Sequence, residues 1–414
     1  MTKLSARTSS KAFDARFALA ARMLGASLPT ERIAGIAMLC NLGDSLPERR
    51  GECAALLCGY LRSTPPGWDR TGRQMGLGES DVRNAIARAL GQRLLVNASP
   101  SWRETPLDFQ SAVFGDRTVF DHAHLVGTAL FRGAWFNGVA SFYGATFSCH
   151  AEPVLGDDDQ GAVGTLSPEP GGAGTPHALA TDESYREDVF TGTVFVGGAN
   201  FARSVFTGRG QFSGAVFEAA ADFADVEFRT HAAFIGASFQ GVAQYSGCTV
   251  TSNLHFVASR FHHGMSLMGL RVGGWLDLTA AEIDGAADLS SAIIEQLCLD
   301  EVVFDGPLDL SHVAITYLEG SGATFLGAVV GDAAKITMGR LRDSWFMAAV
   351  DLDGAQLGED TDGDEETVDF SGTIFEVDPV ARLAPGSVIP DGAGLTGRGN
   401  VVTWRITRPG KRRG

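Results

Sequence analysis

Large apolar residues recur along most of this chain at steps that alternate between five and six residues. The grid begins with Phe109, Phe114, Phe120, Leu125, Phe131, Phe136, Phe142 and Phe147. It returns without a charged residue at Phe190, Phe195, Phe201, Phe206, Phe212, Phe217, Phe223, Phe228, Phe234, Phe239, Tyr245, Val250, Phe256, Phe261, Leu267, Val272, Leu278, Ile283, Leu289 and Ile294. After a one-residue slip it resumes at Leu299, Phe304, Leu310 and Ile315, and it weakens toward Phe325, Ile336, Leu341, Leu352, Leu357, Phe370 and Phe375.

Neither a helix nor a straight strand brings such a grid to one side. Five steps along an α-helix rotate a side chain by about 140°, so a helix, including a supercoil with an eleven-residue period, scatters the phenylalanines. In a straight strand an odd step places successive phenylalanines on opposite faces. A chain that turns a corner about every five residues points each of these side chains at one axis, and the spacing predicts this arrangement.

A small residue commonly stands two places before the large one, as Ala112 does before Phe114. The same relation holds for Ala123, Ala134, Ala140, Ala199, Ala215, Ala221, Ala232, Ala237, Ala243, Ala281, Ala287 and Ala292, with Thr193 and Ser204 as substitutes. Alternation with a period of two points both side chains inward, where only one of them can be large. Because the relation holds in both unit lengths, we place the extra residue of every second unit at a corner. Glycines such as Gly214 and Gly236 supply backbone freedom between units.

This small-x-large unit resembles the pentapeptide-repeat family over residues 107–150 and 188–377. The resemblance implies a mainly β fold, a right-handed quadrilateral β-helix. One coil would hold about 22 residues, and about ten coils would stack into a rod roughly 50 Å long. Together with the helices expected before it, the chain is similar to the large pentapeptide-repeat proteins of actinobacteria.

Residues 1–104 predict a small α-helical domain, either HEAT-like or a bundle. Apolar residues recur there at helical spacing. Ser45 and Glu48 have the form of a capping box that opens a third helix, and Ser80 and Asp81 can cap a fourth. Because each short helix must bury its apolar stripe against a neighbour, we expect the four to pack together.

The remaining segments follow from composition. We expect the first β-helix coils at 105–150, an acidic flexible insertion at 151–187, the main β-helix at 188–382 and a basic, Pro/Gly-rich tail at 383–414. A second, shorter acidic loop is expected at 358–367.

Charge is unevenly distributed along the chain. It has 33 basic and 49 acidic residues, a formal net charge of -16. The first 104 residues hold 15 basic and 9 acidic side chains, and the last 17 hold six basic and no acidic ones. The segment between them therefore carries a net charge of -28, which favours basic partners.

Two segments suggest ligand chemistry that the spacing does not support. The acidic run from Asp360 to Glu366 lacks the EF-hand pattern, because Gly363 is fourth and Ser371 twelfth from Asp360. A weak, nonspecific divalent-ion site remains the alternative there. The GxGxxG triplet Gly392, Gly394 and Gly397 follows no predicted strand and precedes no predicted helix.

The histidines and cysteines lack partners at metal-ligand spacing. We interpret His122, His124, His262 and His263 as surface residues, and Cys248 and Cys298 as small core residues. Cys53 and Cys58 lie five apart on different faces of one predicted helix. No P-loop, GxSxG or HExxH motif is present. We therefore predict no catalytic, cofactor or metal residues, and a chain that is not an enzyme.

Three functional classes remain. The first is a non-enzymatic interaction module or scaffold whose acidic rod binds a protein with a basic surface. Some pentapeptide-repeat proteins mimic duplex DNA and occupy the DNA-binding saddle of type II topoisomerases such as DNA gyrase, so the resemblance implies a DNA mimic as the alternative. Direct nucleic-acid binding through the basic ends is disfavoured, because the attached polyanion repels phosphates. If acids only maintain solubility, they should scatter evenly, whereas mimicry requires them on one or two faces.

The expected compartment is the cytoplasm. Six cysteines in 43.6 kDa are too few and too scattered for a disulfide framework. The first residues show no apolar leader, and nowhere do about 18 apolar residues run together. We expect a soluble protein in a reducing environment, with no membrane partner.

Overall fold

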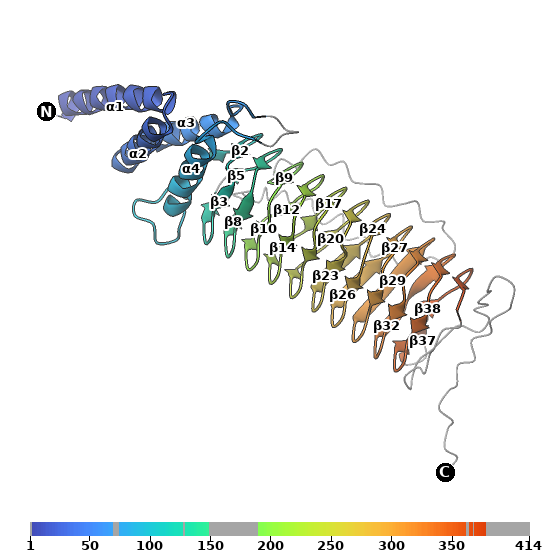
Figure 1. Ribbon diagram of the computed structural model, residues 1–414. Coiled ribbons are helices and arrows are strands. Elements are labelled where there is room, and N and C mark those ends of the chain that lie inside the picture. The colour runs from blue at the N-terminus through green and yellow to red at the C-terminus, as the bar shows by residue number, and fades with distance from the viewer. Residues whose placement is uncertain are drawn as a thin grey trace, which may run out of the picture.

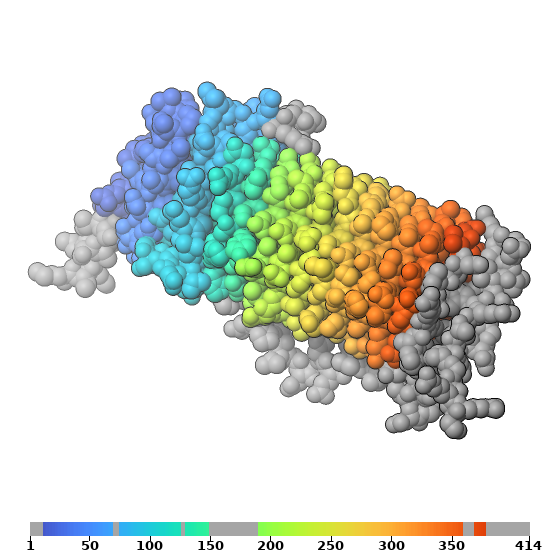
Figure 2. Space-filling view, turned by 60° about the horizontal axis from the view of Figure 1, so that its bottom comes forward, coloured from blue at the N-terminus to red at the C-terminus, as the bar shows by residue number. Residues whose placement is uncertain are grey.

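The fold is taken from a computed structural model, which describes residues 2–68, 74–126, 129–148, 189–361, 364–366 and 368–377. The insertion expected at 151–187, the tail at 383–414 and the GxGxxG triplet lie outside these residues. Four helices form one end of the molecule, and a mainly β, parallel solenoid of about nine turns extends from them (Figure 1). The two parts continue into each other as one elongated body (Figure 2).

The helical domain is built around its second helix. Its elements are α1 (Thr2–Leu24), α2 (Pro29–Ser45), the 3-10 turn η1 (Pro47–Arg49), α3 (Arg50–Arg62) and α4 (Glu79–Arg93). Helix α2 packs against α1, α3 and α4, while α3 and α4 also contact the first strands of the solenoid. Leu39, Leu57, Leu61, Ile86 and Leu90 are fully buried between them. The helices therefore close one end of the solenoid core.

Two predicted helix caps are wrong. Ser45 is the last residue of α2, and its hydroxyl donates to the carbonyl of Asn41 at 2.7 Å instead of opening α3. The intervening η1 begins at Pro47, a residue that favours the first turn of a helix. Gly78, with a φ of +71°, caps α4, and Ser80 lies inside its first turn. The hydroxyl of Ser80 binds the solenoid instead.

The solenoid has four faces, which we number in the order in which the chain crosses them. Face 1 is an 11-stranded parallel sheet and face 2 a 10-stranded one, whereas faces 3 and 4 are joined in a 14-stranded sheet. Face 1 comprises β2 (Val113–Phe114), β6 (Trp135–Phe136), β9 (Val194–Phe195), β13 (Val216–Phe217), β17 (Ser238–Phe239), β21 (Arg260–Phe261), β24 (Glu282–Ile283), β27 (Val303–Phe304), β30 (Thr324–Phe325), β33 (Trp345–Phe346) and β39 (Ile374–Phe375). Face 2 comprises β3 (Arg117–Val119), β7 (Val139–Ser141), β10 (Ala199–Asn200), β14 (Ala221–Asp222), β18 (Ala243–Gln244), β22 (Met265–Ser266), β25 (Ala287–Asp288), β28 (Leu308–Asp309), β31 (Val329–Val330) and β34 (Val350–Asp351).

Faces 3 and 4 share their longest strands. Face 3 comprises β4 (His124–Val126), β8 (Thr146–Ser148), β11 (Val205–Phe206), β15 (Glu227–Phe228), β19 (Thr249–Val250), β23 (Arg271–Asp277), β26 (Ile293–Cys298), β29 (Ala314–Ser321), β32 (Lys335–Arg342) and β35 (Gln356–Leu357). Face 4 begins with β1 (Leu107–Asp108) and β5 (Ala129–Leu130) and continues through β12 (Gly210–Gln211), β16 (Ala232–Ala233), β20 (Leu254–His255), the second halves of β23, β26, β29 and β32, and β38 (Val368–Asp369).

The large residues of the predicted grid point into the interior of the solenoid and form its core. Phe195 pairs in register with Phe217, and Phe217 with Phe239, so one coil holds 22 residues as expected. Their rings stack at centroid separations of 4.9 and 4.7 Å. Ala199 and Ala221, two of the small residues, are also buried and stack in the next face. Burying each large side chain contributes roughly 2–3 kcal/mol before conformational entropy is subtracted.

Two kinds of corner alternate around each coil. On faces 2 and 4, the residue two places after the inward-pointing residue of each unit has a positive φ. Examples are Gly214 at +64° and Arg203 at +58°. These are tight turns closed by a backbone hydrogen bond between residues three apart, such as that from the Ser204 N–H to the Phe201 carbonyl. The six-residue units follow faces 1 and 3. The extra residue therefore lies at alternate corners, as predicted.

The one-residue slip marks a change in coil length. The register shifts between Val272 and Trp275, where β23 pairs with β26. Beyond it Leu276 pairs with Leu297 and Phe304 with Phe325, so the coils contain 21 residues. One residue has been lost from the corner between faces 3 and 4. Strands β26, β29 and β32 consequently run through that corner without a break, and β23 passes through it with the register shift.

The acidic segment predicted as a loop at 358–367 contains a hairpin instead. Strands β36 (Glu359–Thr361) and β37 (Asp364–Glu366) pair antiparallel between β35 and β38. Among the described residues, no helix combines the length and the apolarity that a membrane crossing requires.

Candidate functional site

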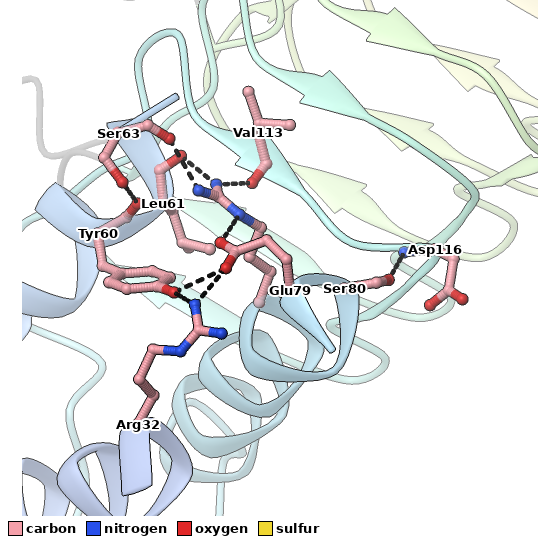
Figure 3. A network of polar contacts seen from close by, with 9 residues as sticks. Arg32, Tyr60, Leu61, Ser63, Glu79, Ser80, Val113 and Asp116 are labelled. Atoms are coloured by element: carbon pink, nitrogen blue, oxygen red, sulfur yellow. Dashed lines mark hydrogen bonds and ion pairs between the residues drawn. The ribbon is translucent and has the colours of Figure 1, made fainter. Parts of the chain in front are cut away.

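The junction between α4 and the solenoid is a buried polar network (Figure 3). The guanidinium of Arg83 is fully buried and donates to the carbonyls of Val113 at 2.6 Å, Leu61 at 2.8 Å and Ser63 at 2.8 Å. Its Nε donates to Glu79 at 2.7 Å. Burial lowers the pKa of Arg83, and the Glu79 carboxylate opposes that effect. One side chain thus joins two helices to the first strand of face 1.

Glu79 also connects the junction to α2. Arg32 donates to the same carboxylate, and the hydroxyl of Tyr60 donates to it at 3.0 Å. Burial and the neighbouring Glu79 raise the pKa of the Tyr60 hydroxyl. A buried carboxylate needs partners for its lone pairs, and Glu79 obtains them from three helices.

Two further side chains of α4 bind the open edge of the solenoid. The Ser80 hydroxyl accepts from the Asp116 N–H at 2.9 Å, and the Asn84 amide oxygen accepts from the Arg117 N–H at 3.2 Å. The Asn84 amide nitrogen also donates to the Asp116 carboxylate at 2.5 Å, and this bond lowers the pKa of Asp116. The helical domain therefore satisfies edge groups that could otherwise pair with another chain.

Outside the hairpin of β36 and β37, most acids of the described solenoid lie on or beside faces 1 and 2. They are Asp116, Asp121, Glu218, Asp222, Asp225, Glu282, Asp284, Asp288, Asp305, Asp309, Asp332, Asp351, Asp353 and Glu376. Only Arg117, Arg203 and Arg260 oppose them on the described parts of these faces. C-terminal to Arg260, the described residues of the two faces hold nine acids and neither lysine nor arginine. We call these nine, from Glu282 to Glu376, the acidic ribbon.

Several aspartates of face 2 also close corners. The Asp288 carboxylate accepts from the Ser290 N–H at 2.8 Å, and Asp309 accepts from Ser311 at 2.8 Å. Asn200 performs the same task for the Ala202 N–H at 2.9 Å. An amide therefore suffices for the turn. The negative charge at these positions is not required by the local structure.

Apart from the acidic hairpin of β36 and β37, which is inserted between β35 of face 3 and β38 of face 4, these two faces are nearly balanced in charge. Their described acids are Asp108, Glu227, Asp277, Glu295, Asp300, Glu301, Glu319, Asp343 and Asp369, and their bases are Arg132, Arg209, Arg229, Arg271, Lys335, Arg340 and Arg342. Several are paired across coils. Arg340 binds Glu319 through two nitrogens at 2.8 and 3.1 Å, and Arg342 binds Asp369 at 2.6 Å. Outside that hairpin, the side of the solenoid opposite the acidic ribbon therefore carries less net charge.

Face 3 also carries a shallow hollow of about 520 Å³. Its lining runs across five coils from Thr249 to Lys335, with Arg271, Glu295 and Thr316 among the residues between them. The Thr316 hydroxyl donates to Glu295 at 3.4 Å. Small residues on the outward face make the hollow, which is open and lacks an evident nucleophile–base pair.

The histidines singled out in the sequence lie apart. His122 occupies a tight turn with a φ of +55°, while His124 lies on β4, where burial and then Arg103 lower its pKa. His262 forms a pair with Asp284 at 3.2 Å, and His263 is exposed beside it. Among the described residues, no group of three His, Cys, Asp or Glu side chains is arranged to hold a metal ion.

The named cysteines are buried and free. Cys248 and Cys298 lie in the solenoid, and Cys53 and Cys58 in α3. Burial raises the pKa of Cys298 to about 12 and that of Cys53 to about 11. Such thiols are poor nucleophiles near neutral pH.

Sequence reasoning found the excess of acid but not its arrangement. Every residue of the acidic ribbon except Asp332 lies one place beside a grid position. Sorting the acids by their distance from the grid would have assigned most of them to a face. No family model, curated protein or solved structure matches this chain.

Proposed function

We propose that this chain is a non-enzymatic protein-interaction module of the pentapeptide-repeat type, which binds a basic protein surface through faces 1 and 2. The small-x-large unit and the four-faced coil support the family assignment. The excess of acids over bases on two adjacent faces, fourteen acids against three arginines in the described residues, carries the functional proposal. A purely solubilising role would not require the acids outside the hairpin of β36 and β37 to be concentrated on two of the four faces.

The linear charge density of the acidic ribbon can be compared with that of duplex DNA. Nine carboxylates lie along five strands of face 1 and the adjoining part of face 2. At about 4.8 Å per strand, five strands span about 24 Å, which is roughly one negative charge per 2.7 Å. Duplex DNA carries one per about 1.7 Å of its axis. A surface that binds DNA phosphates would therefore meet a comparable linear charge.

That comparison supports a DNA mimic as the second candidate function. In this role the ribbon would occupy the DNA-binding surface of a topoisomerase of the gyrase type or of another DNA-binding protein. The N-terminal half of the two faces fits less well, because Arg117, Arg203 and Arg260 dilute its acids. A DNA supercoiling assay with stoichiometric chain tests this candidate, and an unchanged supercoiling rate would discard it.

The general proposal is tested by quantitative affinity capture from extracts of the native host at increasing salt. The bait is the full chain or a ribbon variant, Asp288→Asn, Asp309→Asn and Asp351→Asn, in which each amide can still close its turn. A matched control neutralises Asp108, Glu227 and Glu295, which lie on the other faces. We expect the ribbon variant to lose the salt-sensitive partner and the control to retain it. Equal capture by both variants would contradict the proposal.

A further inference from the structure

An apolar strip interrupts face 1 inside the acidic ribbon. It comprises Val303, Leu326, Trp345, Met347 and Ile374 on and beside strands β27, β30, β33 and β39, which pair in register, with Thr324 between Val303 and Trp345. Leu326 is 36% exposed and Met347 is 41% exposed. Four strands at about 4.8 Å make the strip roughly 14 Å long. Two large apolar side chains thus face outward on neighbouring coils.

Acids surround the strip. Asp284 and Asp305 precede Leu326 in the same column of side chains, and Glu376 follows Met347. Glu301 and Asp343 are exposed in the tight turns along the edge toward face 4. The described residues of faces 1 and 2 hold no lysine or arginine within this part of the solenoid. An occupant must therefore be cationic around an apolar centre.

The same face shows, near the helical domain, how such a column can be covered. Trp135 occupies the position equivalent to Trp345, and the ring of Trp68 packs against it edge-on at 5.6 Å. Trp68 belongs to the loop between α3 and α4. Apolar cover of this column by a chain segment is therefore already used once in this molecule.

We propose that the apolar strip and its acidic rim form a docking site for a cationic segment of a partner protein, one that carries bulky apolar side chains among its Lys and Arg residues. This assignment rests on the proposed function and deepens it. The rim supplies long-range attraction and a preference for positive charge. Burial of apolar side chains against Leu326 and Met347 supplies the part of the affinity that salt does not screen.

Two labelled synthetic peptides of equal length and charge test the site. One alternates Lys and Leu, and the other has Ser in place of each Leu. Fluorescence anisotropy with the full chain should show the Leu peptide binding about tenfold more tightly than the Ser peptide. A Leu326→Ser, Met347→Ser variant should abolish that preference. A Val139→Ser, Val242→Ser control, which changes two exposed valines on face 2, should keep it.

The outcomes separate this inference from the proposed function. If both peptides bind in a salt-sensitive manner but the strip variant keeps the full Leu preference, the docking site at the strip is contradicted. The proposed function of the acidic faces then stands. If neither peptide binds at low salt, both are overturned. A chain shortened to residue 397 that binds the Leu peptide more tightly would make the chain's own basic end the occupant. A dimer that dissociates on Leu326→Ser substitution would make it a second copy, and either result overturns the assignment to a partner.

Discussion

The buried guanidinium of Arg83 donates a 2.6 Å hydrogen bond to the carbonyl of Val113, the first residue of the first strand of face 1. That carbonyl lies at the edge of the solenoid, where no preceding coil can pair with it. With Ser80 and Asn84, Arg83 makes α4 a substitute for the missing coil. The helical domain therefore acts as the cap that a repeat structure requires at its end.

Replacing Arg83 by methionine should destabilise this junction by about 3–5 kcal/mol, because it leaves the Glu79 carboxylate and the edge carbonyls buried without their partner. Hydrogen exchange measured by mass spectrometry should show faster exchange in α4, β2 and β3. The matched control is Arg49→Met, since Arg49 forms exposed pairs with Asp14 and Glu52 and should alter exchange little. Unchanged protection of β2 in the Arg83 variant would contradict the capping role.

The tight turns predict opposite effects at two equivalent corners of face 4. Gly236 has a φ of +62° and open space around its Cβ position, so Gly236→Ala should cost about 1 kcal/mol through backbone strain alone. Ala258 already bears that strain at +53°, and Ala258→Gly should be neutral or slightly stabilising. Urea denaturation of both variants checks the pair. A destabilising Ala258→Gly beside a harmless Gly236→Ala would reject the turn assignment.

Replacing an aspartate of the ribbon by asparagine should leave stability nearly unchanged, whereas replacing it by alanine should lower stability. Asp288→Asn keeps an oxygen for the Ser290 N–H and should change the free energy of unfolding by less than about 0.5 kcal/mol. Asp288→Ala removes the acceptor and should cost about 1 kcal/mol. Thermal unfolding followed by circular dichroism distinguishes the two. Equal losses would mean that the charge itself, and not the turn, stabilises this corner.

The junction should weaken in acid. The hydrogen bond from Asn84 holds the pKa of Asp116 below its ordinary value, so the folded state favours the carboxylate. This contribution is complete above the unfolded pKa of about 3.9 and is lost as the pH falls through the lower folded value. Hydrogen exchange of β3 should therefore accelerate on acidification below about pH 4, after correction for the intrinsic rate. Asn84→Ala should reduce this pH dependence, and an unaltered dependence would exclude Asp116 as its source.

Much of the solenoid could be predicted because its core repeats. A phenylalanine such as Phe217 must lie over its equivalent in the next coil, so spacing alone determines which side chains point inward. The acidic hairpin of β36 and β37 was missed because it is a polar pair of strands, and the grid reports only buried positions. Its backbone pairing leaves no hydrophobic period to detect.

The junction could not be predicted for a different reason. Arg32 and Glu79 are 47 residues apart, and their contact exists only once α2 and α4 have packed. Ser45 satisfied the local capping pattern, yet its hydroxyl binds back into α2 because the chain turns through η1 first. Local signals therefore failed where tertiary packing set the partners, and succeeded where each coil repeats the previous one.

The most direct test of the account measures how the affinity for the captured partner changes with salt. Binding of the wild-type chain, the Asp288, Asp309 and Asp351 ribbon variant and the Asp108, Glu227 and Glu295 control should be compared between 50 and 500 mM salt, at roughly logarithmic intervals. We expect a clearly shallower salt dependence and weaker binding for the ribbon variant alone. Identical curves for the two variants would show that total charge, and not its position on faces 1 and 2, governs binding.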